Sequence, residues 1–318
     1  MRAAILPPIL FILAFPAFAQ SASEQILRAK QLLDEGQPKA AVVMLEPLTR
    51  QDTSSLSEHE RGVAWDVLGS SYQDLEMLEQ AKQAYGRAIE ALRSIPEAKA
   101  QYAAAICDLG SVEASLGQDD SAKALYTKAT GIYQSLGNSA GVNITATNLA
   151  MLAAGRSDFR TTRRYLATAF QAAQRSTTLR DDNLAAMYSV NSEVEFHDGR
   201  YQQAIASAQQ SIDHWTHAHG PGYFMLGLGY SLRAQAIAKT RDYSRAITDV
   251  QHALAIFEAA QGRNRDAYLR IQLVYAEILR ESGEKDEGSR LKKEASSSLA
   301  RLESRQCDGC TINVNGFR

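Results

Sequence analysis

The stretch Trp65-Asp66-Val67-Leu68-Gly69-Ser70-Ser71-Tyr72 carries a glycine in the middle of a helical pattern. Ala81 follows it, with Tyr85 and Ala88 four and seven residues further on, so these three lie on one stripe of a second helix. A glycine at position 69 lets the two helices approach closely, because it has no side chain to hold them apart. The segment therefore predicts two packed helices joined by a short turn.

The same pattern recurs along the chain every 40 to 42 residues. A small residue heads the second helix of nearly every unit, at Ala40, Ala81, Ala122, Thr162, Ala204, Ala246 and Gly288. The glycine position, twelve residues earlier, holds Arg28, Gly69, Gly110, Ala150, Ser192, Ala234 and Ala276. Such self-similarity is typical of repeat proteins whose units stack into a solenoid. We expect seven helix-turn-helix units over residues 20–305.

The signature positions of the tetratricopeptide repeat are filled in order by Trp65, Leu68, Gly69, Tyr72, Ala81, Tyr85 and Ala88. The chain resembles that family over roughly residues 21–303, and its period resembles the long, 42-residue variant of kinesin light chains. The resemblance implies an all-α, right-handed α-solenoid of about seven helical hairpins. It also implies a scaffold for protein interactions, with neither enzymatic activity nor a cofactor. Arg28 in the first unit and Lys292 in the last depart from the pattern, as capping repeats do.

Residues 1–19 are expected to be a secretory signal peptide. Arg2 precedes an apolar run from Ile5 to Phe18, and Ala17-Phe18-Ala19 forms an Ala-x-Ala cleavage site before Gln20. An uncleaved membrane anchor is the alternative. However, the 17 uncharged residues from Ala3 to Ala19 include three prolines and are short for about 30 Å of hydrocarbon. Cleavage predicts a periplasmic or extracellular protein without a stable membrane span.

Composition excludes several classes of protein. Lys and Arg number 34 against 36 Asp and Glu, a net charge of −2, whereas a nucleic-acid-binding surface needs clustered cations. A chain that is 45% hydrophobic and 22% charged is close to the average of soluble proteins, which excludes gross disorder. Three cysteines are too few for a disulfide-rich scaffold.

Two motifs raise the alternative of a metal- or redox-linked accessory protein. His214 and His217, three residues apart, are spaced as metal ligands on one helical face, but histidines also favour a solvated helix end because of the helix dipole. Cys307 and Cys310 form a C-x-x-C pair in the tail, residues 306–318, where an exported protein would form a disulfide or keep a reduced turn. Neither motif has the context that catalysis needs, so no catalytic residue and no metal site are predicted.

The concave surface of a solenoid is lined by the first helix of each unit. Positions three before, one after and four after the glycine position are expected to face it. They supply the candidate binding residues Asp66, Ser70, Gln73, Ser111, Thr147, Met151, Ser189, Glu193, Phe196, Ser231, Gln235 and Glu277.

These residues predict a groove that binds a peptide or protein segment through hydroxyls, amides and a few apolar side chains. The alternative is that small residues simply pack adjacent helices. Arg280 is the single basic residue in these columns, so a clamp for a C-terminal carboxylate is not expected. A structural homo-oligomer remains a further alternative.

Overall fold

The computed structural model describes residues 21–50, 56–259 and 265–306, and these form seven antiparallel pairs of helices. The first three pairs are α1 (Ala22–Asp34) and α2 (Pro38–Arg50), α3 (Glu58–Asp74) and α4 (Leu78–Leu92), and α5 (Lys99–Ser115) and α6 (Asp119–Ser135), with a 3-10 turn at Pro96–Ala98. The next two are α7 (Ser139–Gly155) and α8 (Phe159–Arg175), and α9 (Asp181–His197) and α10 (Tyr201–His219). The last two are α11 (Leu226–Lys239) and α12 (Tyr243–Ala259), and α13 (Arg265–Ser282) and α14 (Lys285–Gln306). The predicted all-α, right-handed solenoid of seven hairpins is confirmed.

The turn inside each hairpin repeats at the level of the backbone. Each contains one residue in the left-handed region, with φ between 56° and 109°. These residues are Gly36, Glu76, Gly117, Ser157, Gly199, Arg241 and Gly283, spaced by 40, 41, 40, 42, 42 and 42 residues. Glycine adopts this conformation without steric cost, and it ends a helix by reversing the chain direction. The period read from side chains is therefore also the period of the turns.

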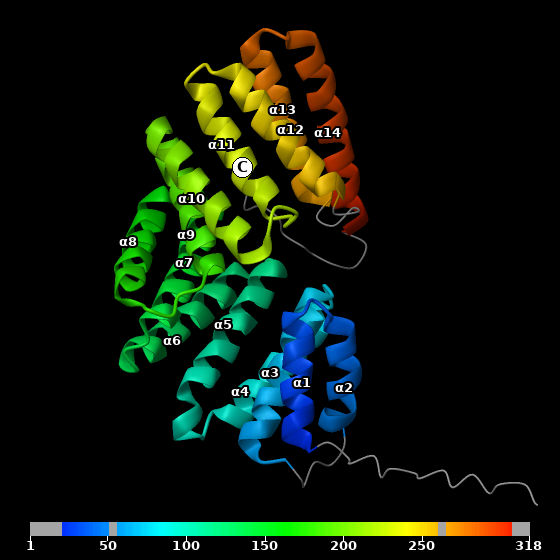
Figure 1. Cartoon of the computed structure of the whole chain (residues 1–318), viewed down its shortest axis with the longest axis vertical. Coiled ribbons are helices and arrows are strands. Elements are labelled where there is room, and N and C mark those ends of the chain that lie inside the picture. Colours follow the sequence, from blue (N-terminus) through cyan, green and yellow to red (C-terminus); the bar gives the residue numbers. More distant parts are fainter. Residues whose placement is uncertain (1–20, 51–55, 260–264, 307–318) are drawn as a thin grey trace, which may run out of the picture.

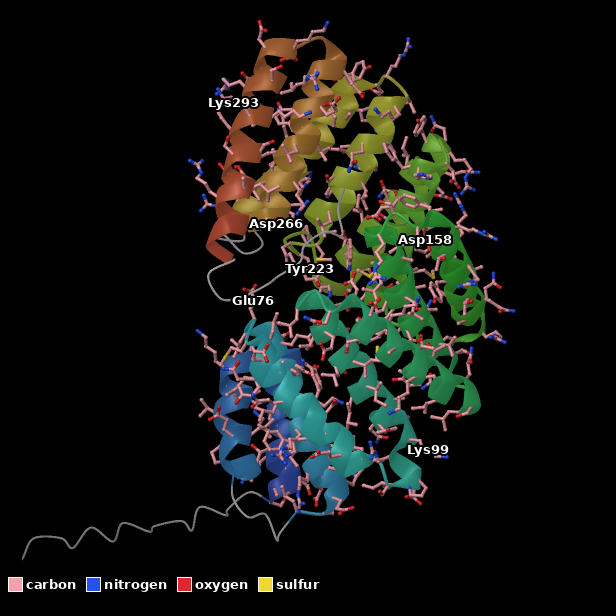
Figure 2. The ribbon with its side chains drawn as sticks, turned by 180° about the vertical axis from the view of Figure 1, so that it is seen from behind. Glu76, Lys99, Asp158, Tyr223, Asp266 and Lys293 are labelled. Atoms are coloured by element: carbon pink, nitrogen blue, oxygen red, sulfur yellow. The ribbon has the colours of Figure 1, made fainter. Side chains whose placement is uncertain are left out.

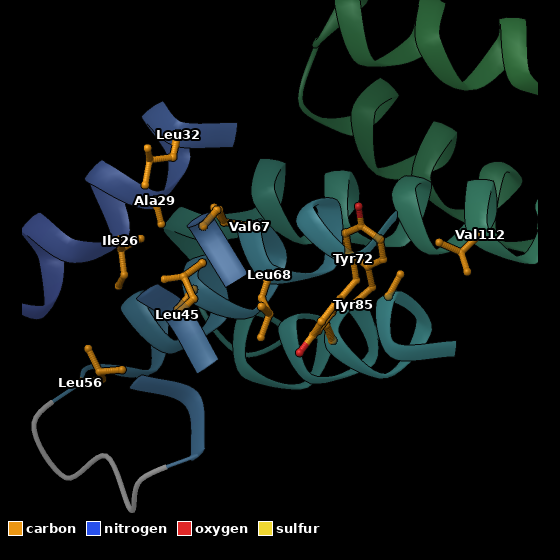
Figure 3. Packing of buried hydrophobic residues seen from close by; sticks show 14 residues of the cluster. Ile26, Ala29, Leu32, Leu45, Leu56, Val67, Leu68, Tyr72, Tyr85 and Val112 are labelled. Atoms are coloured by element: carbon orange, nitrogen blue, oxygen red, sulfur yellow. The ribbon is translucent and has the colours of Figure 1, made fainter. Parts of the chain in front are cut away.

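At the glycine position the two helices of a hairpin approach each other closely. A Cβ on Gly69 would lie 2.8 Å from the ring of Tyr85, and a Cβ on Gly110 would lie 2.8 Å from the ring of Tyr126. Tyr85 is buried beside Leu68 in the core of the N-terminal units (Figure 3). Its hydroxyl donates to Gln73 Oε1 at 3.0 Å and lies 3.1 Å from Ser70 Oγ, so the ring is anchored through its hydroxyl.

Gly69→Ala is expected to lower the free energy of unfolding by about 1–2 kcal/mol, because the held Tyr85 ring must move to admit a methyl group. Gly86→Ala is the matched control, since that helical glycine has open space around its Cβ. The control is expected to gain about 0.5–1 kcal/mol from helix propensity alone. Urea unfolding followed by circular dichroism measures both changes, and a stabilised Gly69→Ala would contradict the close packing.

The stack of hairpins curves, so that its first and last pairs lie on the same side of the molecule (Figure 1). The first helices α7, α9, α11 and α13 contact one another in succession. The α10–α11 loop, with Tyr223, approaches the α3–α4 turn, with Glu76 (Figure 2). Burial and the carboxylates of Asp182 and Asp74 raise the pKa of Tyr223, which places α3 and this loop within electrostatic range. The curvature thus brings together segments about 150 residues apart.

Candidate functional site

A cavity of about 730 Å³ opens on the inner face of the C-terminal units. Its walls are the first helices α9, α11 and α13, and the α7–α8 turn closes one end with Ser157 and Phe159. Phe159 stacks on His197 with ring centroids 3.9 Å apart, which fixes that end. Most of the wall is aliphatic or aromatic, including Leu228, Leu232, Val274 and Ile278. Pockets of about 300–1,000 Å³ with apolar walls and a few polar groups are typical of ligand sites.

Five of the twelve candidate binding residues line this cavity: Glu193, Phe196, Ser231, Gln235 and Glu277. Gln235 Nε2 donates to the carbonyl of Ser231 at 3.4 Å, one turn earlier on α11. Glu277 accepts from Arg280 at 2.9 Å. The structure thus brings together five of the six residues expected from units five, six and seven.

Four other polar candidates take part in hydrogen bonds inside their own hairpins. Ser70 and Gln73 contact the Tyr85 hydroxyl, and Ser111 accepts from the Tyr126 hydroxyl at 3.1 Å. Ser189 Oγ lies 2.7 Å from Ser211 Oγ. These four side chains join a first helix to its second helix, so their hydrogen-bonding capacity is directed at packing.

Thr147 and Met151, both on α7, differ sharply in exposure. Thr147 is 2% exposed, and its hydroxyl has no hydrogen-bond partner among the described residues. Met151 is 46% exposed and presents an apolar surface to solvent. Neither lines the cavity.

An acidic pair lies further along the first helices. Burial raises the pKa of Asp66 on α3 to about 6, with Lys30 opposing the shift. Its Oδ1 has no hydrogen-bond partner in the described part of the chain. Burial, together with the charge of Asp66, raises the pKa of Asp108 on α5 to about 8, and Arg180 opposes that shift. Two desolvated carboxyls within range of one another cannot both ionise cheaply.

Glu193 is a half-buried carboxyl of the cavity itself. Burial alone raises its pKa to about 7, since no cation in the described structure opposes the shift. Glu195, two residues later, accepts from Ser207 Oγ at 2.6 Å, whereas no such partner is seen for Glu193 among the described residues. The cavity therefore holds an acid that has neither a hydrogen-bond partner nor a counter-charge among the described residues.

Residues that lie next to the chosen positions of each first helix were not selected in the sequence analysis. Leu232 and Val274 line the cavity, and Asp108 belongs to the acidic pair, yet all three lie two residues before the glycine position. The column three before that position was chosen instead. A search for charged or large apolar side chains at both positions would have found them.

The repeat pattern is matched independently by a family profile. Residues 60–135 match the tetratricopeptide repeat. The chain contains tetratricopeptide repeats. No curated protein matches it.

Solved structures share the fold of this chain. The apo form of RapI aligns over 89% of this chain and 100% of that chain, with a TM-score of 0.64 and 11% identity. A Rap protein complexed with competence and sporulation factor covers 90% and 78%, with a TM-score of 0.62 and 12% identity. The APC/C hetero-tetramer Cut9-Hcn1 covers 85% of this chain at a TM-score of 0.59 and 16% identity, but this chain spans only 48% of that one. Identities this low show a common fold and nothing finer.

The two histidines of the metal alternative, His214 and His217, contact an aspartate in the structure. His214 Nδ1 and His217 Nδ1 each lie 2.6 Å from one oxygen of Asp181, and His219 Nε2 lies 2.5 Å from Asp182. These contacts tie the end of α10 to the first turn of α9. No group of three or more potential metal ligands occurs in the described residues.

The remaining predictions for the two ends fall outside the described residues. The signal peptide, residues 1–19, and the Cys307/Cys310 pair stay predictions. Within the described ranges, no helix is long and apolar enough to cross a membrane. A thiol titration of the denatured protein would test the pair, because a disulfide leaves one reactive thiol, that of Cys107, and a reduced pair leaves three.

Proposed function

We propose that this tetratricopeptide repeat protein is a non-catalytic scaffold that binds a peptide or protein segment on its inner face. The observation that carries the proposal is the cavity of about 730 Å³, which three successive first helices line and which contains five of the candidate binding residues. The fold supports it, since curved helical repeats present extended concave binding surfaces. The structural neighbour complexed with competence and sporulation factor offers a parallel from the same fold.

The double substitution Glu193→Lys and Gln235→Lys is expected to weaken capture of the partner at least tenfold without loss of helicity. Both side chains line the cavity, and two lysines would fill part of it and reverse its charge. Affinity capture of crosslinked partners by tagged protein, read by mass spectrometry, measures the effect. The matched control is Glu79→Lys with Gln80→Lys, the same chemical change at exposed positions of α4.

Capture that is equal in wild type, cavity variant and control would contradict the assignment of the cavity. Capture of the chain by itself, as the sole product, would favour the homo-oligomer. One partner lost from the cavity variant and kept by the control would support the scaffold and locate its binding face.

The location outside the cytoplasm is part of the same proposal and rests on residues 1–19. An Ala-x-Ala site before Gln20 follows a charged residue and an apolar run. Export predicts a mature protein that begins at Gln20. N-terminal sequencing of the native protein tests this, and an intact Met1 on protein recovered from the cytoplasm would contradict it.

A further inference from the structure

Every charged side chain of the cavity except one has a counter-charge in the described structure. Lys239 Nζ lies 2.5 Å from Glu281, Arg270 Nε lies 2.8 Å from Asp266, and Glu277 accepts from Arg280 at 2.9 Å. Glu193 lies among these groups on α9 without an ion pair or hydrogen bond to a described residue. The unmatched group of the cavity is therefore an acid.

The surroundings of Glu193 make its isolation costly. A half-buried carboxyl that accepts no hydrogen bond from the protein has lost part of its hydration without replacement. An occupant that donates hydrogen bonds to this carboxyl would restore the lost interactions. A hydrogen bond to a charged group is stronger than one between neutral groups, so an occupant that supplies it is expected to bind at least tenfold more tightly.

The other residues that line the cavity indicate the chemistry of the rest of the bound molecule. Leu232 on α11 and Val274 and Ile278 on α13 are among the apolar side chains of the walls. Ser231 and Gln235 add polar groups on α11. An occupant that matches this lining has an apolar part against α11 and α13 and a cationic donor against α9.

We propose that the cavity binds a segment of a partner protein in which an arginine or lysine side chain neighbours an apolar one, with the cationic group on Glu193. The inference rests on the scaffold function proposed above and specifies the partner's chemistry. Charge complementarity selects a basic segment, because every acid of the cavity except Glu193 is already paired. The apolar walls select a peptide over a free cation, which would leave them uncovered.

The test measures the binding of two defined peptide mixtures to the purified protein. Both are acetylated, amidated and fluorescein-labelled hexapeptides, with mixtures of leucine, valine and alanine around one fixed residue. The fixed residue is arginine in one and citrulline, its uncharged analogue of the same shape, in the other. Fluorescence anisotropy is expected to show at least tenfold tighter binding of the arginine mixture, the lower end of the range for a charged hydrogen bond.

Glu193→Gln is expected to reduce this preference to less than twofold. Glu79→Gln, the same change at an exposed position of α4, is expected to leave it unchanged. Circular dichroism establishes that both variants are folded. The arginine-citrulline comparison in the wild type does not depend on any variant, so the proposal is tested even if a variant fails to fold.

Several outcomes would overturn the proposal. These are equal affinity for the two mixtures, a preference that survives in Glu193→Gln, and binding of arginine amide as tight as that of the peptides. Binding that appears only after deletion of residues 307–318 would also overturn it, since the chain's own Phe317 and Arg318 would then be the occupant. Peptide binding without a preference for arginine refutes this inference alone, whereas failure of all peptides and of partner capture refutes the scaffold function as well.

Discussion

Replacing Arg233 with Met is expected to lower the free energy of unfolding by about 3–5 kcal/mol, the typical cost of leaving one member of a buried ion pair alone. Arg233 on α11 and Asp249 on α12 are 13% and 8% exposed. The guanidinium donates two hydrogen bonds of 2.7 Å, one to each oxygen of Asp249. It also contacts Gln209 on α10 and lies 5.0 Å from the ring centroid of Tyr230.

The large effect follows from the side chain that stays behind. Methionine preserves the apolar stem of Arg233 but leaves the Asp249 carboxyl buried beside it without a cation. Arg290→Met on α14 is the control, because Arg290 pairs with Glu287 and Glu294 at 60% exposure and is expected to contribute less than about 1 kcal/mol. Urea unfolding measures both. A loss below about 1 kcal/mol in Arg233→Met would show that water reaches Asp249 in the folded protein.

The fold could be predicted from the sequence because small residues recur with the period of the repeat. Gly69 and Gly110 lie against Tyr85 and Tyr126, the aromatic positions sixteen residues later. A larger side chain is excluded at such close contacts, so the pattern survives wherever two helices must touch. Ser192 fills the same position in the fifth unit, and its hydroxyl donates to the carbonyl of Ala204 at 2.8 Å, which only a small polar side chain allows.

The cavity could be predicted only in part, because its shape depends on how hairpins stack. Helical spacing places Glu193 and Gln235 on the inner side of their own helices. It does not fix how far each helix rotates against the next, and a small rotation exchanges a residue for its neighbour. Leu232 and Val274 line the cavity for this reason, beside Ser231 and Leu273, which lie three residues before the glycine position.

The ion pairs could not be predicted from the repeat pattern either. Arg233 meets Asp249 on the second helix, sixteen residues away. Each lies one residue before a signature position, where the repeat specifies no charge. The pairing is visible only once side-chain rotamers are placed. It matters for the site, because pairing removes most charged groups of the cavity from consideration and isolates Glu193.

Replacing Asp108 with Asn is expected to stabilise the protein increasingly as the pH rises. Burial and Asp66 raise the pKa of Asp108 to about 8, whereas an unfolded chain has an aspartate pKa of about 4. Between these values the folded protein retains a proton that the unfolded chain releases, so the wild type loses stability as pH increases through this window. Asparagine does not titrate, so the variant lacks this loss.

The advantage of Asp108→Asn over the wild type is expected to grow by about 3 kcal/mol from pH 5 to pH 9. A shift of the Asp108 pKa from about 4 to about 8 would make the advantage grow somewhat more. The smaller value is expected because Arg180 stabilises the ionised form and the accessible surface of Asp108 is that of a half-buried residue. Urea unfolding at the two pH values measures the growth, and comparing the two values cancels any constant cost of the amide. Glu79→Gln, at an exposed position, is the control and should show no comparable trend. An advantage that stays constant with pH would mean that Asp108 ionises normally in the folded protein, with a ligand-accessible, well-hydrated inner face at α5.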